Sequence, residues 1–200
     1  MLRFLRWAKE HHPNLYPAWL LQGLAGLRGW EAMFLRECDV DWDAKTIEVT
    51  ETPLHRPKNL YSFRLLPVGE TIMREPRWAL DQRQGDRHEG CISVNPKGEP
   101  WGERERLYGP YDRFEEYLKT GLPEGVERIS PKDLRKSFST LCETELGVSG
   151  LALGSYLGHS AQGVRLRHYT DARQIEFLRR EVAEKVEEWV RCGGSELFRA

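Results

Sequence analysis

The opening part of the chain carries hydrophobic patterns that are typical of helices. Residues 2–11 place apolar side chains among charged ones, which predicts a short amphipathic helix. Residues 17–27 are nearly all apolar and predict a buried helix that ends near Gly26 or Gly29. Residues 31–36 are expected to add one or two further helical turns. The chain therefore begins as a group of short helices.

From Asp39 onward the pattern changes to one that is typical of strands. Apolar and polar residues alternate at 40–42 and again at 46–50, with a turn at 43–45 between them. After a proline-containing loop, residues 61–66 predict a returning strand that is ended by a proline. These segments predict a small antiparallel sheet of about three strands.

The middle of the chain is rich in glycine, proline and charge. Residues 81–105 are expected to form loops with one short strand at 91–94, and residues 111–119 to form a helix. With the elements before and after it, this segment gives an α+β fold that is mainly α-helical.

The clearest helix start in the chain is at Ser130. This serine can cap the helix, Pro131 suits the first helical position, and Asp133 complements the positive end of the helix dipole. The helix is expected to run to about residue 146 and to stop at Gly147.

Two further helices complete the pattern. Residues 149–157 predict a helix that is ended by Gly158, and Asp171 is expected to cap a last helix over about residues 172–190. The last helix carries an apolar stripe at steps of three and four residues: Ile175, Leu178, Val182, Val186 and Val190.

Length and composition fit one globular domain that covers residues 1–200. The chain is 40% hydrophobic and 30% charged, which is ordinary for a protein with a packed core. It has no run of about 18 apolar residues, so no membrane span is expected. Residues 1–7 lack the apolar segment and cleavage site of a secretory signal, which favours a cytoplasmic protein.

The four cysteines are scattered, without the close spacing that a disulfide framework or a zinc site needs. We expect reduced thiols, packed mostly in the core, and no bound metal. Their positions are Cys38, Cys91, Cys142 and Cys192.

The distribution of charge is more informative than its sum of −1. Residues 128–180 carry nine Lys and Arg against five Asp and Glu, a net +4, whereas residues 81–127 carry seven against eleven, a net −4. The positive segment is also the one with the candidate chemistry. Clustered cations favour a nucleic-acid partner, although a DNA-binding domain is usually basic overall.

Within the positive segment, several side chains form a candidate phosphate site. Lys132 and Arg135 are three residues apart near a helix start and would share one face, where they could hold an anion. His159 directly follows a glycine helix stop, and Tyr169 lies ten residues further on in a basic run. Each residue alone also fits a structural role, as a solvated basic face or as a packing residue.

The order of these residues resembles the catalytic domain of the tyrosine recombinases, the phage integrase family. The matching segments are Leu27-Arg28-Gly29-Trp30-Glu31, Lys58 ahead of Leu66-Pro67, Lys132-x-x-Arg135, Leu157-Gly158-His159, and Tyr169-Thr170. The resemblance spans roughly residues 15–190, with lysine at position 132 where the family usually has histidine.

The resemblance implies a site for breaking and rejoining double-stranded DNA. It assigns Arg28 and Arg135 to the phosphate oxygens, with His159 as a further donor. It assigns Tyr169 as the nucleophile that forms a 3′-phosphotyrosine, and Lys58 as the general acid. Lys132 would support the phosphate or accept the tyrosine proton. No cofactor is required, because the covalent link preserves the phosphodiester energy.

The resemblance also implies a tetramer on DNA, joined through the C-terminal helix. That helix could instead cover the core of its own domain. The DNA-clamping domain that the family carries at its N-terminus is expected to be absent. Alternatives are a catalytically inactive DNA-binding protein of the same fold, a nicking enzyme similar to type IB topoisomerases, and an unrelated helical protein.

Overall fold

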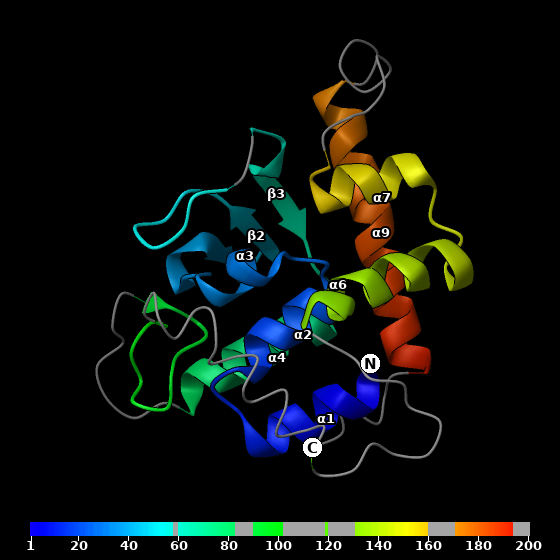
Figure 1. The fold of residues 1–200 in the computed structure, drawn as a ribbon. Coiled ribbons are helices and arrows are strands. Elements are labelled where there is room, and N and C mark those ends of the chain that lie inside the picture. Colours follow the sequence, from blue (N-terminus) through cyan, green and yellow to red (C-terminus); the bar gives the residue numbers. More distant parts are fainter. Residues whose placement is uncertain (58–59, 83–89, 102–118, 120–130, 160–170, 194–200) are drawn as a thin grey trace.

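The computed structural model describes residues 1–57, 60–82, 90–101, 119, 131–159 and 171–193. It is mainly helical with one small sheet, which confirms the α+β prediction (Figure 1). The helices are α1 (Leu2–His11), α2 (Tyr16–Leu24), α3 (Gly29–Met33), α4 (Glu70–Asp81), α6 (Pro131–Thr140), α7 (Gly150–Leu157) and α9 (Ala172–Cys192). The strands are β1 (Val40–Asp41), β2 (Thr46–Val49) and β3 (Arg64–Pro67). Among the described residues, no helix is both long enough and apolar enough to cross a membrane.

The sheet is antiparallel with three strands, as predicted, and their order is β1-β2-β3. Ile47 pairs with Val40 on one side and with Leu66 on the other. The third strand begins later than expected, because residues 60–62 form a helical turn before Arg64. The short strand expected at 91–94 is wrong as well: only an isolated bridge pairs Cys91 with Arg36.

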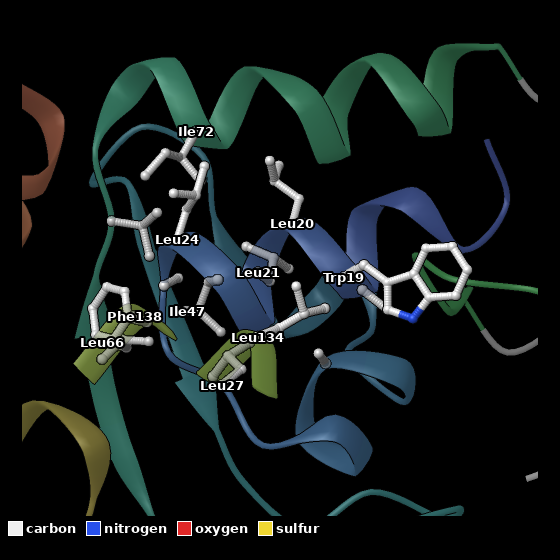
Figure 2. Packing of buried hydrophobic residues seen from close by; sticks show 14 of the residues in the cluster. Trp19, Leu20, Leu21, Leu24, Leu27, Ile47, Leu66, Ile72, Leu134 and Phe138 are labelled. Carbon is white, nitrogen blue, oxygen red and sulfur yellow. The ribbon is translucent and has the colours of Figure 1, made fainter. Parts of the chain in front are cut away.

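Helix α2 is the centre of the core because every one of its residues is buried. Leu20 and Leu24 lie between α2 and α4, while Leu27 and residues of α6 and β3 gather on the other side (Figure 2). Burial of large aliphatic side chains contributes roughly 1.5–3 kcal/mol each. The predicted buried helix is therefore confirmed, and it packs against α1, α3, α4 and α6.

Helix α4 is the one described helix that the sequence pattern did not indicate. It spans residues 70–81 and buries Ile72, Met73, Ala79 and Leu80. Pro76 lies inside it and cannot donate a backbone hydrogen bond to the preceding turn, which hides the helix from a reading of local propensity. Packing against α2 outweighs this local cost.

The predicted helix boundaries near the candidate site are confirmed where the structure describes them. Helix α6 continues as a wider helical turn over residues 141–145, and Gly147 follows with a positive φ of 58°. Ser149 caps α7 by accepting a hydrogen bond from Ala152 N at 3.2 Å, and Gly158 ends α7 in the left-handed conformation. Asp171 caps α9 through Arg173 N at 3.1 Å. Ser130 lies outside the described residues.

Helix α9 covers the core of its own domain with its C-terminal half. Val182, Val186 and Val190 are buried, whereas Ile175 and Leu178 are only half-buried. Figure 1 shows α7 crossing in front of α9, and the two helices pack against each other. Two of the four cysteines, Cys91 and Cys142, are buried and two are exposed, so the expectation that most lie in the core is wrong.

Glu187 of α9 also caps the N-terminus of α4, so it joins two elements that are far apart in sequence. Its carboxylate accepts hydrogen bonds from the backbone N–H of Thr71 at 3.1 Å and from the Thr71 hydroxyl. A negative charge at this end of a helix also complements the helix dipole.

We expect Glu187→Ala to lower the free energy of unfolding by roughly 1–2 kcal/mol, because the α4 N-terminus loses its cap. Glu184→Ala is the matched control, since this exposed residue lies one turn earlier on the same helix. Urea denaturation followed by circular dichroism measures both. Equal stabilities of the two variants would contradict the capping role.

Candidate active site

The candidate site lies at the C-terminal end of α7, where the chain leaves the helix. Gly158 has φ 65°, a left-handed conformation that glycine adopts without strain, and His159 N donates to the Gly154 carbonyl at 3.1 Å. This turn displays His159 at the helix end, as predicted. It also leaves the last carbonyl groups of α7 without partners inside the helix.

Arg28 reaches this helix end from the turn before α3. Its Nη2 donates to the Gly158 carbonyl at 3.1 Å, and its Nη1 donates to Glu31 at 2.7 Å and to Ser62 Oγ at 3.1 Å. Glu31 in turn accepts from the backbone N–H of Arg28 at 2.9 Å. The guanidinium is therefore fixed on three sides before any ligand binds.

Arg135 reaches the same place from α6. Its Nη2 donates to the Leu157 carbonyl at 2.8 Å, and its Nη1 donates to the Gly26 carbonyl. Gly26 has φ 61°, and a Cβ there would lie 2.7 Å from the side chains of Phe138 and Leu157, so this position requires glycine. Arg28 and Arg135 thus converge on neighbouring carbonyls, although 107 residues separate them in the sequence.

Arg64 is a third arginine in this cluster, and the sequence analysis did not identify it. Its side chain is 0% exposed; Nε donates to the Tyr156 carbonyl at 2.9 Å and Nη2 to Glu31 at 3.0 Å. A signal was present in the sequence. Arg64 lies two residues before Leu66 on one strand, and this spacing places both side chains on the inward face.

The cluster combines three guanidinium groups with one carboxylate, and therefore keeps an excess of positive charge. Burial alone would raise the pKa of Glu31, but Arg64 and the hydrogen bonds from Arg64 and Arg28 outweigh it and bring the pKa to about 2. Burial, and then the neighbouring charge of Arg28, lower the pKa of Arg135 to about 10. Arg135 stays charged at neutral pH, and an anion bound beside it would relieve the repulsion.

His159 completes the described part of the site, and its protonation follows from its neighbour. Its Nε2 lies 3.3 Å from Nη2 of Arg135. A guanidinium can only donate, so Nε2 must accept, and the proton of the neutral ring lies on Nδ1. Loss of hydration, followed by Arg135, Arg28 and Arg64, lowers the pKa of His159. At neutral pH the ring is therefore uncharged and can donate from Nδ1.

We expect the imidazole of His159 to titrate with a midpoint below 6.5 in the folded protein. The folded state then binds fewer protons than the unfolded state, so this group favours folding less as the pH falls below about 6.5. Saturating inorganic sulfate should raise the midpoint, because an anion stabilises the charged ring. NMR titration measures both, with the His159→Gln spectrum as assignment control. A midpoint at or above 6.5 without sulfate would contradict the charge environment described here.

Of the three remaining predicted site residues, the structure describes one. Lys132 is exposed on α6, one turn before Arg135, and its side chain is open to solvent. Lys58 and Tyr169 lie outside the described residues. Within the part of the chain that the structure describes, no group of three or more His, Cys, Asp and Glu side chains could hold a metal ion.

Comparison with solved structures identifies the fold. The complex of the Tn1549 transposon integrase with transposon right end DNA matches with a TM-score of 0.63 and 21% identity over 95% of this chain. A circular-intermediate complex of the same integrase has a TM-score of 0.62 at 21% identity over 85% of this chain, and XerA recombinase has 0.60 at 17% over 90%. This chain has the tyrosine recombinase catalytic-domain fold. The resemblance in fold predicted from the sequence is thereby confirmed.

The match to the tyrosine recombinase fold is structural. This chain spans 60–63% of the length of those three solved chains. No family model matches the sequence, and no curated protein matches it. The hydrogen bonds of Arg28, Arg135 and His159 bring these three side chains together at the end of α7.

Proposed function

We propose that this chain is the catalytic domain of a site-specific DNA recombinase, which cleaves and rejoins double-stranded DNA through a 3′-phosphotyrosine intermediate. The observation that carries the proposal is the convergence of Arg28 and Arg135 on the neighbouring carbonyls of Gly158 and Leu157, beside His159. Two arginines from distant segments with an adjacent imidazole suit the oxygens of one phosphodiester. The recombinase fold supports the same reaction class.

Each proposed role follows from the chemistry of the side chain. Arg28 and Arg135 donate to the non-bridging oxygens, where negative charge builds up as the phosphorus becomes five-coordinate. His159 adds a donor from Nδ1. Loss of one such preorganised donor typically slows a reaction by roughly 100- to 1,000-fold.

The covalent step involves residues outside the described part of the site as well. The Tyr169 oxygen attacks the phosphorus, a P–O(tyrosine) bond forms, and the bond to the 5′-oxygen of the DNA breaks. The phenol gives its proton to solvent water, Lys132 supports the phosphate as a cation, and Lys58 protonates the leaving 5′-oxygen. Rejoining reverses these transfers, so the reaction consumes neither ATP nor another cofactor.

The experiment that tests the proposal is covalent capture of a nicked duplex, in which loss of a short 5′-terminal strand prevents rejoining. We expect an adduct that survives denaturing electrophoresis and maps to the peptide with Tyr169. DNA retardation without an adduct would instead favour an inactive DNA-binding protein of this fold. Relaxation of supercoiled DNA without site preference would favour a nicking enzyme similar to the type IB topoisomerases.

The proposed assembly is a tetramer on DNA that uses the N-terminal half of α9. Val182, Val186 and Val190 cover the domain's own core, whereas Phe177, in the half before Arg180, is 69% exposed and is available to a neighbour. Burial of such an aromatic side chain is a common source of affinity between proteins. Light scattering of the protein–DNA complex reports the stoichiometry, and one protomer per DNA site at saturation would contradict the tetramer.

A further inference from the structure

A fourth arginine joins the carbonyl end of α7, and it comes from α9. Arg179 Nε donates to the Ser155 carbonyl at 3.2 Å, and its Nη1 donates to the Leu65 carbonyl of β3 at 3.2 Å. The carbonyls of residues 155–158 are the last four of the helix and its cap, and each accepts from a different arginine. In carbonyl order, the donors are Arg179, Arg64, Arg135 and Arg28.

This arrangement gives each of the four carbonyls a side-chain donor, although the Ser155 carbonyl also accepts from Gly158 N at 3.4 Å, and it links four elements at one point. The negative end of the helix dipole stabilises the converging cations. Burial, and then the positive charge of Arg64, lower the pKa of Arg179. The two hydrogen bonds of Arg179 therefore hold it in place although Arg64 repels it. Arg179 is the member of the set that ties α9 to the candidate active site.

The position of α9 limits the position of the proposed nucleophile. Tyr169 precedes the N-cap Asp171 by two residues, a span of at most about 7 Å of extended chain. Arg179 follows Asp171 by eight residues, about 12 Å along the helix at 1.5 Å per residue. A shift of the N-terminal half of α9 would therefore move the backbone that carries Tyr169.

The N-terminal half of α9 has few apolar anchors of its own. The buried residues of this helix begin at Val182, and residues 172–174 are exposed. The two hydrogen bonds of Arg179 thus hold α9 ahead of its buried half, on both α7 and β3. These are the elements that also carry His159 and Arg64.

We propose that Arg179 is a positioning residue, which fixes the start of α9 against the carbonyl end of α7 and so aligns Tyr169 with the phosphate held by Arg28 and Arg135. This inference rests on the proposed function. In this proposal Arg179 acts through the backbone of α9 and contacts neither DNA nor the reacting atoms. Its effect should therefore appear in the rate of the covalent step rather than in DNA affinity.

The test compares Arg179→Met with Arg180→Met in the full chain. Arg180 is the matched control, because it is the next residue of the same helix, is exposed, and pairs with Glu176 one turn earlier. We expect Arg179→Met to slow single-turnover capture at saturating DNA by roughly 10- to 100-fold, since a misplacement of about 1 Å can cost 100-fold. DNA affinity should stay within about twofold of the wild type. Arg180→Met should match the wild type, and Arg179→Lys should recover part of the rate.

Amide hydrogen exchange over residues 172–178 gives a second readout that does not depend on activity. We expect faster exchange in Arg179→Met and unchanged exchange in Arg180→Met. If the wild type captures DNA and Arg179→Met captures it at the same rate, the inference is overturned. A loss of DNA affinity in Arg179→Met as large as its loss of rate would also overturn it. Absence of capture in the wild type would refute the proposed function. Hydrogen exchange alone would then decide whether Arg179 anchors the start of α9. Equal exchange in both variants would overturn the anchoring role.

Discussion

Tyr169→Phe is expected to abolish covalent capture of a nicked duplex while DNA binding stays nearly intact. The substitution removes one oxygen, and that oxygen is the nucleophile of the proposed reaction. Hydrolysis by water in place of the phenol would leave no bond between protein and DNA, so it would not produce an adduct. Arg28 and Arg135 hold the phosphate in the proposal, and both remain, so gel retardation should change by less than about twofold.

The matched control for this result is Tyr16→Phe. Tyr16 is buried and donates to Glu75 at 2.9 Å on a different part of the fold, so its loss costs some stability and should leave capture in place. Denaturing electrophoresis of wild type and both variants gives the comparison. An adduct of wild-type yield in Tyr169→Phe would remove Tyr169 from the mechanism.

The second large effect is expected for Glu31→Gln, which should lower the free energy of unfolding by roughly 3–5 kcal/mol at neutral pH. Glu31 is 1% exposed and accepts hydrogen bonds from Arg28 and Arg64, so it is the carboxylate that balances their charge. The NH2 group of a glutamine at this position would face the N–H donors of the arginines. Arg64 would then be buried without a counter-charge. Urea denaturation measures the change.

The same carboxyl predicts a dependence on pH with a definite sign. The pKa of Glu31 is lowered on folding to about 2, so its contribution is fully present above about pH 4.5 and is lost as the pH falls toward 2. The difference in stability between wild type and Glu31→Gln should therefore be constant between pH 7 and 5 and narrow below 4.5. Glu176→Gln is the control, because its ion pair with Arg180 is exposed and should contribute less than about 1 kcal/mol. A pH-independent difference down to pH 3 would contradict the ion pair.

The effects expected for Tyr169→Phe and Glu31→Gln have different origins within one site. Tyr169 is proposed to act on the substrate, whereas Glu31 acts on the arginines before the substrate arrives. A buried ion pair of this kind contributes little net stability against an apolar alternative, but removal of one partner is costly. We infer that Glu31 fixes the orientation of Arg28 and Arg64, with stability as the observable consequence.

Local patterns predicted the elements whose signals lie within one or two turns. Ser149 and Gly158 delimit α7, and Asp171 caps α9, because cap residues act on backbone groups only two or three residues away. The period of two along residues 46–49 indicated β2 for the same reason. Local patterns did not predict helix α4, because Pro76 lowers its local helix propensity and packing against α2 stabilises it.

The sequence by itself determined the helix caps near the site and a three-stranded sheet among helices, and it predicted two arginines, a histidine after a glycine stop and a tyrosine as site residues. Only the tertiary structure decided that the carbonyls at residues 155–158 would gather arginines from four elements. The physical reason is that a helix end leaves its carbonyls unpaired, whereas the partners that satisfy them are chosen by packing between segments far apart in the chain. The spacing of residues along the sequence therefore does not predict which arginine binds which carbonyl.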